Sequence, residues 1–281
     1  MIVDLCQRWR ERRGVYRPAR EPFDPRRYEV AEFYDDATAD AFVGAHHYIG
    51  TLPPVQRRFG LYEGGELVGV VIFSVPTNYG SLRPWGKDDA TELGRLVLLD
   101  HVLANAESWF VRRCLDELAR DGLAGVVSHS DPEPRRDAAG NLVFKGHVGT
   151  VYQALNAVYT GRASRKTMYL LADGREFNNR AASKIRAYAK GGATKRSRGW
   201  RYAIAQLVAE GARQPEPGED LTVWLRSERK RLTRSQAHPG NHRYVFALSR
   251  GAHKDMRRQS LPYPKFETHG VHLPLFAGGA A

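Results

Sequence analysis

A carboxylate at the end of an apolar segment is the first residue whose position suggests chemistry. Asp131 follows the run GVVSHS at 125–130, and Pro132 comes directly after it. A carboxylate that ends a buried strand can act as a general base or can orient an attacking amine. The alternative is that Asp131 only closes an Asx turn before the polar insert PEPRRDAAGN (132–141).

An arginine lies in the middle of a second apolar run. Arg95 is part of ELGRLVLL (92–99), which is otherwise apolar after its first residue. A buried guanidinium needs a partner, and it can hold a phosphate or a carboxylate through two parallel hydrogen bonds. The alternative is an ion pair with an internal acid such as Glu92 or Asp131.

The helix expected after this strand begins without a glycine-rich turn. The connection HVLANA (101–106) has no glycine, Asn105 can cap the helix, and Ser108 lies near its third position. The N–H groups of a helix N-terminus form an anion site together with a serine hydroxyl. The alternative is that Ser108 only satisfies free backbone groups of the first turn.

One tyrosine and three histidines complete the candidates. Tyr152 shares a predicted helix face with Asn156 and Tyr159; its hydroxyl can protonate a leaving group or contact a donor, or it can simply pack at the rim of the core. Adjacent histidines point apart, so at most one of His46 and His47 would face His129 or Asp131. Two histidines and a carboxylate would suit iron, and polar side chains beside a cleft are the alternative.

The elements that must position these residues alternate in type. Periodicity predicts a strand, a helix, three strands, a helix, a strand, a helix and a strand, followed by a long basic insertion and a last strand. The predicted strands are 28–34, 57–63, 66–74, 92–99, 125–130, 166–171 and 243–249, and the predicted helices are 35–46, 105–122 and 150–160. We divide the chain into a basic N-terminal arm without an assigned fold (1–27), a catalytic core (28–174), a basic insertion (175–242), and the last core strand with the tail (243–281).

Charge and cysteine content narrow the function classes. Lysine and arginine number 43 against 31 acidic residues, a formal net charge of +12, which favours a polyanionic partner. Two cysteines are too few for a disulfide scaffold or a thiolate zinc site. No apolar run is long enough for a signal peptide or a membrane span, so we expect a cytoplasmic protein with no membrane partner.

A basic segment in the insertion is the predicted nucleic-acid surface. Residues 175–201 hold nine basic side chains against one acidic, with Tyr188 and Trp200 between them. Cations can hold phosphates while an aromatic ring stacks on a base; the alternative is a solvated helix face. The candidate contacts are Arg180, Lys184, Arg186, Lys190, Lys195 and Arg196, and a second basic run at 226–234 extends the surface.

The order of elements is similar to that of the GNAT acyltransferase fold. In that α/β (α+β) fold, a mixed sheet flanked by helices is splayed between its fourth and fifth strands to admit an acyl donor; here a basic insertion precedes the last strand. Seven motifs between residues 46 and 190 appear in the same order as in the Mom family of phage DNA-modification proteins, which the chain therefore resembles: HHYIG, FGLYEGGELVGVVIF, ELGRLVLLD, NAESWFV, GVVSHSDP, GTVYQALNAVYTG and ASKIR.

The resemblance implies an activity and a set of residues. It implies conversion of adenine in double-stranded DNA to N6-carbamoylmethyladenine in the cytoplasm of a bacterial host, which shields phage DNA from restriction. The implied functional positions are Tyr48, Arg95, Ser108, Asp131 and Tyr152, with Arg95, Ser108 and Tyr152 contacting the donor. His47 corresponds to a proposed metal-binding histidine, with His129 as its candidate partner. The insertion at 133–148 departs from the family pattern.

The resemblance leaves two donors open. GNAT enzymes bind coenzyme A through a glycine-rich turn after the fourth strand, and HVLANA lacks that feature. A charged tRNA is the alternative to acetyl-CoA, because the expected adduct, N6-CH2-CO-NH2, is an isomer of a glycyl amide, N6-CO-CH2-NH2. Two other functions also remain: acyl or aminoacyl transfer to a small molecule or protein amine, and non-enzymatic binding of DNA. The oligomeric state is not predicted.

Overall fold

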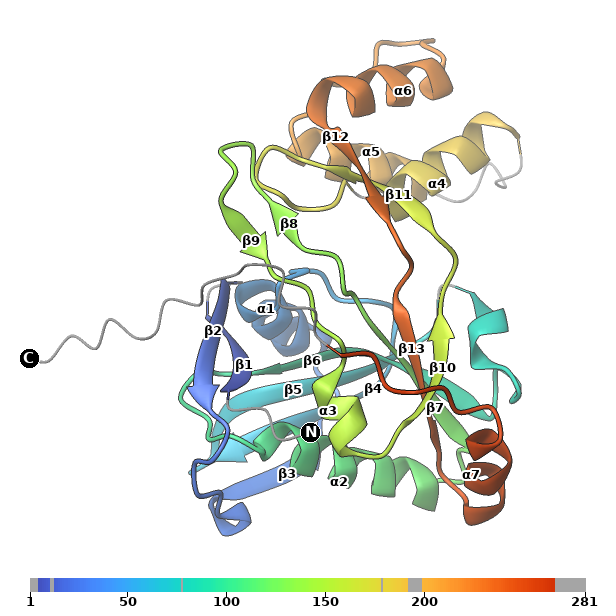
Figure 1. Cartoon of the computed structure of the whole chain (residues 1–281). Coiled ribbons are helices and arrows are strands. Elements are labelled where there is room, and N and C mark those ends of the chain that lie inside the picture. Colours follow the sequence, from blue (N-terminus) through green and yellow to red (C-terminus); the bar gives the residue numbers. More distant parts are fainter. Residues whose placement is uncertain (1–4, 11–12, 77, 178, 192–198, 266–281) are drawn as a thin grey trace, which may run out of the picture.

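The computed structural model describes residues 5–10, 13–76, 78–177, 179–191 and 199–265. Its centre is a seven-stranded mixed sheet with the spatial order β10-β13-β7-β6-β5-β4-β3 (Figure 1). The strands are β3 (Tyr28–Glu32), β4 (Val55–Glu63), β5 (Glu66–Ser74), β6 (Ala90–Leu98), β7 (Gly125–Ser130), β10 (Val158–Arg162) and β13 (His242–Ala247).

Strands β6 and β7 separate part-way along their length. They pair in parallel from Ala90 with Gly125 to Leu93 with Ser128, whereas the other neighbouring pairs described in this sheet are antiparallel. Beyond that point β6 continues beside β5 alone, and β7 continues beside β13 alone. This is the splay between the fourth and fifth strands, so the predicted GNAT-like mixed sheet is confirmed.

A β-bulge at Gly94 changes the direction of the side chains along β6. Two consecutive residues of β5 pair with Leu93 and Arg95, so Gly94 is the extra residue. A Cβ atom on Gly94 would lie 2.5 Å from the hydroxyl oxygen of Ser74, which explains the glycine. Because a bulge shifts the alternation by one residue, Arg95 faces the side of the sheet opposite to Leu93.

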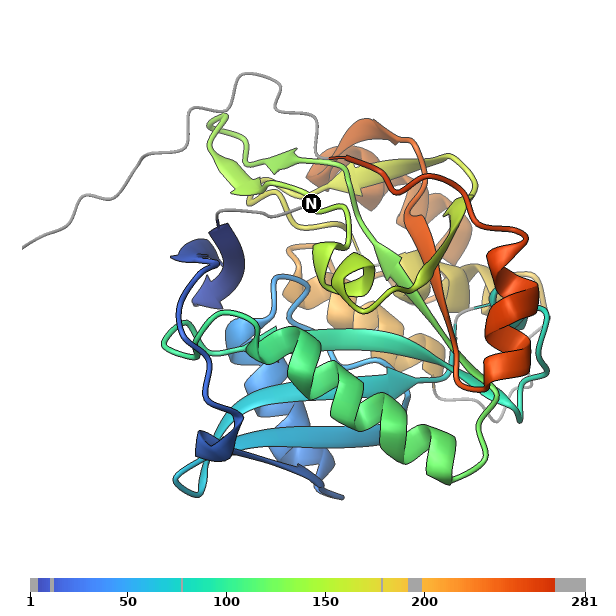
Figure 2. The ribbon, with the colours of Figure 1, turned by 60° about the horizontal axis from the view of Figure 1, so that its bottom comes forward.

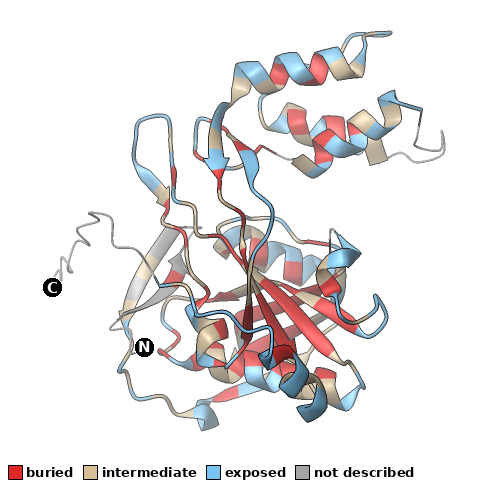
Figure 3. Cartoon of the chain, turned by 45° about the vertical axis from the view of Figure 1, so that its right-hand side comes forward, coloured by how far each residue is buried: buried red, intermediate tan, exposed pale blue. Residues whose placement is uncertain are grey.

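Helices cover both faces of the sheet. On the face that carries Leu93, α2 (Ala106–Arg120) and α3 (Thr150–Ala154) pack over the largest cluster of buried side chains (Figure 2). On the opposite face, α1 (Asp36–His46) packs against a smaller cluster that includes Val97. Burial is concentrated in the central strands between these layers (Figure 3). Arg95 therefore faces the α1 side.

The C-terminal part of one predicted helix is a strand. The prediction of a helix at 150–160 is wrong after Ala154, because Asn156 adopts a positive φ of 58° that ends the helix and Val158–Arg162 forms β10. Tyr152 and Tyr159 consequently do not share a helix face. The predicted core strand at 166–171 is also misplaced: β11 (Lys166–Leu170) pairs with β12 (Arg234–His238) in a separate ladder outside the main sheet.

Three helices follow β11, and we call them the helical layer. They are α4 (Asn179–Ala189), α5 (Gly199–Ala209) and α6 (Leu221–Leu232). They pack around their own buried cluster, in which Phe177 and Trp224 are fully inaccessible. The ladder of β11 and β12 leads from the main sheet to this layer (Figure 1).

Other segments form short structures around the sheet. The N-terminal arm, for which no fold was predicted, contains the N-terminal hairpin of β1 (Leu5–Arg10) and β2 (Arg13–Pro18). The insertion at 133–148 contains the hairpin of β8 (Arg135–Arg136) and β9 (Leu142–Phe144). The remaining elements are η1 (Pro25–Arg27), η2 (Tyr79–Leu82) and α7 (Arg250–Arg257). Among the helices that the structure describes, none has the length and apolarity needed to cross a membrane.

Candidate active site

Asp131, directly after β7, is held by three donors. Its Oδ1 atom lies 2.9 Å from Nε2 of His238 and also accepts a hydrogen bond from the backbone N–H of Glu133, while Oδ2 forms an ion pair with Arg135. The Nδ1 atom of His238 accepts the backbone N–H of Gly240 at 3.0 Å, so the proton of a neutral His238 ring is on Nε2 and points at Asp131. The Asx turn considered from sequence is present, but it is only part of this network.

The electrostatics of Asp131 favour a carboxylate that stays ionised. Burial raises its pKa, but the hydrogen bond from His238 and the charge of Arg135 outweigh burial and hold the pKa well below its usual value. A carboxylate with such a low pKa is a weak proton acceptor at neutral pH. Of the two roles predicted from the sequence, orientation of an amine therefore suits Asp131 better than removal of its proton.

Arg95 has no carboxylate partner in the described part of the chain. Its Nε donates to the carbonyl oxygen of Thr51 at 3.0 Å and its Nη1 to that of Gly94 at 2.6 Å. Burial lowers its pKa, and Tyr48 and Glu92 are near enough to act on its charge. Among the described residues, no acid forms the ion pair with Arg95 that was considered from the sequence. The guanidinium keeps further N–H donors for an anion at the splay.

Tyr48 lies in a column of stacked planar groups. Its ring centroid is 4.4 Å from that of His47 and 4.5 Å from that of Phe144, and the guanidinium of Arg135 lies 4.6 Å from the Phe144 centroid. Burial raises the pKa of the Tyr48 hydroxyl, with the charge of Asp131 acting in the same direction. The hydroxyl therefore remains protonated and can donate a hydrogen bond.

His147 faces the same column and was not identified from the sequence. Its ring meets that of Tyr48 edge-on at 6.2 Å and that of Phe144 at 6.3 Å. Burial lowers the pKa of His147 to about 4, so the imidazole is neutral at pH 7. Its backbone N–H donates to the carbonyl oxygen of Asp131 at 2.8 Å. The insertion at 133–148 thus supplies Arg135, Phe144 and His147 to the site.

Tyr152 approaches the splay from the α2 side of the sheet. Its ring packs against Tyr244 and Phe246, and its hydroxyl lies beside that of Ser128. Ser128 is the last β7 residue paired with β6, and its hydroxyl donates to the carbonyl oxygen of Leu93 at 3.2 Å. Burial raises the pKa of Tyr152. Both the packing and the functional interpretation of this tyrosine fit its position.

Ser108 is separate from these residues. Its hydroxyl donates to the backbone carbonyl of Asn105 at 3.1 Å, which agrees with the local interpretation of this serine. Asn105 occupies the N-cap position in a left-handed conformation, and its side chain makes no capping hydrogen bond but donates to the carbonyl of Ala19. The expected side-chain cap by Asn105 is therefore wrong.

Arginine from the N-terminal hairpin fills the turn between β6 and α2. Arg8 is 1% exposed; it donates to the carbonyl oxygens of Val102 at 3.2 Å and Leu103 at 2.7 Å and forms an ion pair with the buried Glu107. The neighbouring N–H, that of Ala104, donates to the carboxylate of Glu21 at 3.1 Å. The carbonyl groups of this turn thus point at a guanidinium. A phosphate-binding turn has the opposite polarity, because it presents backbone N–H groups to the ligand.

The histidines do not gather as metal ligands. In the ranges of the chain that are described, no group of three His, Cys, Asp or Glu side chains is placed to hold a metal ion. Nδ1 of His47 accepts the backbone N–H of Ile49 at 3.1 Å, and Nδ1 of His129 lies 3.8 Å from Oε1 of Glu92. The predicted iron site at His47 and His129 therefore does not fit the residues present.

The structure brings together four of the five predicted catalytic residues. Asp131, Arg95 and Tyr152 all lie close enough to act on the Tyr48 hydroxyl. The sequence missed His238, which lies 107 residues after Asp131. The sequence HPG at 238–240, in which a histidine precedes a turn, was the local feature that could have drawn attention to His238.

The basic segment forms α4 and the start of α5. Arg180, Lys184, Arg186 and Lys190 lie on or directly after α4, whereas Lys195 and Arg196 lie outside the described residues. Arg180 is near enough to lower the pKa of Arg95, so this layer reaches the splay. The rings of Tyr188 and Trp200 stack on each other at 4.1 Å.

Comparisons with known proteins give one family. A model of the Mom protein family matches residues 27–265. No curated protein matches the chain.

Similar solved structures are acetyltransferases of low identity. A tandem GNAT protein from the clavulanic acid biosynthesis pathway is 10% identical, with 79% of this chain and 99% of that chain covered and a TM-score of 0.41. The ribosomal-protein-S18-alanine N-acetyltransferase of Escherichia coli is 15% identical, with 53% and 88% covered and a TM-score of 0.34. For an N-acetyltransferase of Staphylococcus aureus Mu50 the identity is 18%, the coverages are 40% and 56%, and the TM-score is 0.27; the chain thus spans little more than half of that protein.

Proposed function

The chain belongs to the Mom protein family, and from this premise we propose that it is a transferase that converts adenine in DNA to N6-carbamoylmethyladenine and so shields phage DNA from restriction. One observation carries the proposal: Arg95 lies on β6 and Asp131 directly after β7, the two strands that separate, and both are close to the hydroxyl of Tyr48. An ionised carboxylate suits an amine on one side, and a guanidinium whose described partners are carbonyl oxygens suits a polar donor on the other.

The residues of the site divide the transfer step between them. Asp131 orients the N6 amino group, whose nitrogen attacks the carbonyl carbon of the donor ester. A C–N bond forms, the C–O ester bond breaks, and the proton that N6 loses replaces the proton that a tyrosine hydroxyl gives to the departing oxygen. The protonated hydroxyl of Tyr48 or Tyr152 donates to the departing oxygen.

The filled turn before α2 bears on the donor. A coenzyme A diphosphate at this turn would have to displace Arg8 and Glu21 from their backbone partners. This supports a donor bound elsewhere, and we propose glycyl-tRNA over acetyl-CoA. Glycyl transfer gives N6-CO-CH2-NH2, and rearrangement to its isomer N6-CH2-CO-NH2 then needs no further atoms.

The amino group must leave the base stack before it can react. In a duplex N6 is paired, so base flipping or a single-stranded substrate is required. We propose that the enzyme acts on double-stranded DNA by flipping. The basic helical layer beside the splay supports a nucleic-acid substrate over a small molecule or a protein amine.

Mass analysis of nucleosides tests the function directly. DNA from a plasmid co-expressed with this protein should contain adenine heavier by C2H3NO, the mass of a carbamoylmethyl group less the hydrogen that it replaces. Its fragmentation should differ from that of the isomeric glycyl amide, and the modification should survive phenol extraction. Unmodified adenine would reject the proposal, and protection that disappears with the protein would instead indicate binding without catalysis. Purified protein with DNA and labelled glycyl-tRNA, compared with acetyl-CoA and a nitrogen source, identifies the donor.

A further inference from the structure

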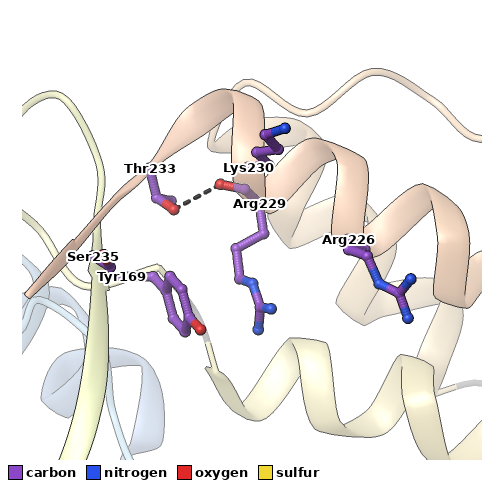
Figure 4. A pocket seen from close by; sticks show the side chains of 6 residues that line it. All are labelled: Tyr169, Arg226, Arg229, Lys230, Thr233 and Ser235. Atoms are coloured by element: carbon purple, nitrogen blue, oxygen red, sulfur yellow. Dashed lines mark hydrogen bonds between the residues drawn. The ribbon is translucent and has the colours of Figure 1, made fainter.

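A basic pocket lies in the helical layer, away from Asp131. It has a volume of about 220 Å³ and lies between α6 and the ladder of β11 and β12 (Figure 4). Three cations, one aromatic ring and two hydroxyl groups line it: Arg226, Arg229, Lys230, Tyr169, Thr233 and Ser235.

The three cations share one face of α6. Arg226, Arg229 and Lys230 stand at positions i, i+3 and i+4, where side chains on a helix are neighbours. No carboxylate of the described residues forms an ion pair with any of them. Like charges at this spacing repel one another, so an anion bound between them would relieve the repulsion.

The single acidic residue of α6 is turned away from this face. Glu228 is 2% exposed, accepts the backbone N–H of Arg213 at 3.1 Å, and forms an ion pair with Arg231. Its negative charge is therefore used inside the helical layer. In α6 the acidic side chain is therefore buried, whereas three cationic side chains line the pocket.

Tyr169 positions one of the cations. The guanidinium of Arg229 lies 4.1 Å from the centroid of the Tyr169 ring, a cation–π contact that limits the directions available to Arg229. Ser235 pairs with Tyr169 across the β11–β12 ladder and exposes its hydroxyl at the pocket, whereas the hydroxyl of Thr233 donates to the carbonyl of Arg229 at 2.6 Å. One oriented guanidinium, two further cations and a hydroxyl suit a tetrahedral oxyanion.

We infer that this pocket binds a phosphate of the DNA backbone. The inference rests on the proposed function for the identity of the nucleic acid. The helical layer reaches the splay, since Arg180 of α4 acts on the charge of Arg95. A duplex held at α6 can therefore extend toward the site where its base is modified. The pocket offers cations to a backbone rather than an apolar slot for a base, so its contribution is independent of sequence.

Direct DNA binding by a triple variant tests the pocket. Arg226→Gln, Arg229→Gln and Lys230→Gln are combined, and the matched control combines Arg250→Gln, Lys254→Gln and Arg257→Gln, three exposed cations of α7. Fluorescence anisotropy measures Kd for two duplexes of unrelated sequence at several salt concentrations. Circular dichroism verifies that both triple variants melt as the parent does.

The expected result separates the two triple variants. The pocket variant should bind both duplexes about tenfold or more weakly, and the slope of log Kd against log salt should fall by roughly 0.9 for each lost phosphate contact. The α7 control, which loses the same charge, should change little. Arg229→Lys alone should keep the salt slope but lose part of the affinity, because an ammonium keeps the charge and lacks the planar fork.

Three outcomes would overturn the inference. They are equal loss in both triple variants, loss for only one duplex sequence, and loss of tRNA binding with DNA binding intact. Because binding is measured without catalysis, a protein that fails to modify adenine but loses DNA affinity through the pocket variant supports the pocket and rejects the proposed function. If the parent protein modifies adenine but the pocket variant binds DNA as tightly as the parent, the proposed function is supported and the pocket inference is rejected.

Discussion

Nε2 of His238 lies 2.9 Å from Oδ1 of Asp131, and this contact joins the end of β12 to the end of β7. The side chain of His238 is fully buried, and Gly240 fixes its tautomer from the other side. The ladder that leads to the helical layer therefore also holds the carboxylate at the splay. Asp131 is placed by two distant segments, its own strand and β12.

Substitution of this pair should reduce modification in a non-additive way. Asp131→Asn keeps the shape but removes the charge, and we expect the rate to fall by about 100-fold or more. His238→Gln should give a smaller loss, since Arg135 and Glu133 still contact Asp131. The double variant should be no slower than Asp131→Asn, as expected if His238 acts only through Asp131. Nucleoside mass spectrometry gives the rates, and a further large loss in the double variant would contradict this role.

Arg95→Gln should weaken the use of the donor without weakening the binding of DNA. Loss of charged hydrogen bonds of about 1.5–3 kcal/mol corresponds to roughly ten- to hundredfold in KM for the donor. Arg95→Lys should recover only part of this, because an ammonium lacks the planar fork. Steady-state kinetics with varied donor measure the effect. An unchanged KM with a weakened affinity for DNA would place Arg95 on the substrate side instead.

The bulge at Gly94 should be sensitive to a single methyl group. In Gly94→Ala the new Cβ would lie 2.5 Å from Oγ of Ser74, so we expect lower stability and a misdirected Arg95. Removing that oxygen with Ser74→Ala should restore part of both stability and activity in the double variant. Denaturant unfolding and modification assays provide the two measurements. Equal effects of Gly94→Ala with and without Ser74 would argue against this contact.

Six of the seven strands of the sheet could be predicted from the sequence, whereas β10 and the long-range parts of the site could not. Continuous apolar runs such as 66–74 and 125–130 indicate strands that are buried on both faces of a sheet. Such a run can be recognised from neighbouring residues alone. The contact of His238 with Asp131 depends on how the basic insertion folds back, which no local pattern encodes. The error at 158–162 has a local cause: a left-handed Asn156 overrides a helical spacing.

Stability should fall as the pH decreases from about 6.5 to 4. Burial lowers the pKa values of His147 and His242 to about 4, so in this window the unfolded chain binds protons that the folded chain does not. The stability from these neutral rings is complete above pH 6.5 and is lost as the pH falls. In His147→Gln, the slope of unfolding free energy against pH should be smaller by up to about one proton. Urea titrations between pH 7.5 and 4.5 measure it. Identical slopes would show that His147 takes up its proton over the same pH range in the folded and the unfolded chain.

The occupied turn before α2 leads to a prediction about coenzyme A. A ligand that binds the folded state raises its melting temperature, and the increase grows with concentration. Because Arg8 and Glu21 already form hydrogen bonds with the backbone of this turn, acetyl-CoA should leave the melting temperature unchanged, while glycyl-tRNA should raise it.

Arg8→Ala should cost about 3–5 kcal/mol of unfolding free energy, since it leaves the buried carboxylate of Glu107 without the guanidinium of Arg8. Adding Glu107→Leu should recover part of that loss, although the hydrogen bonds that Arg8 donates to the carbonyl groups of Val102 and Leu103 remain lost. Acetyl-CoA could instead raise the melting temperature of the parent protein, and raise it more than that of the Arg8→Ala variant. The N-terminal hairpin would then belong to a coenzyme A site, and the preference for glycyl-tRNA would be wrong.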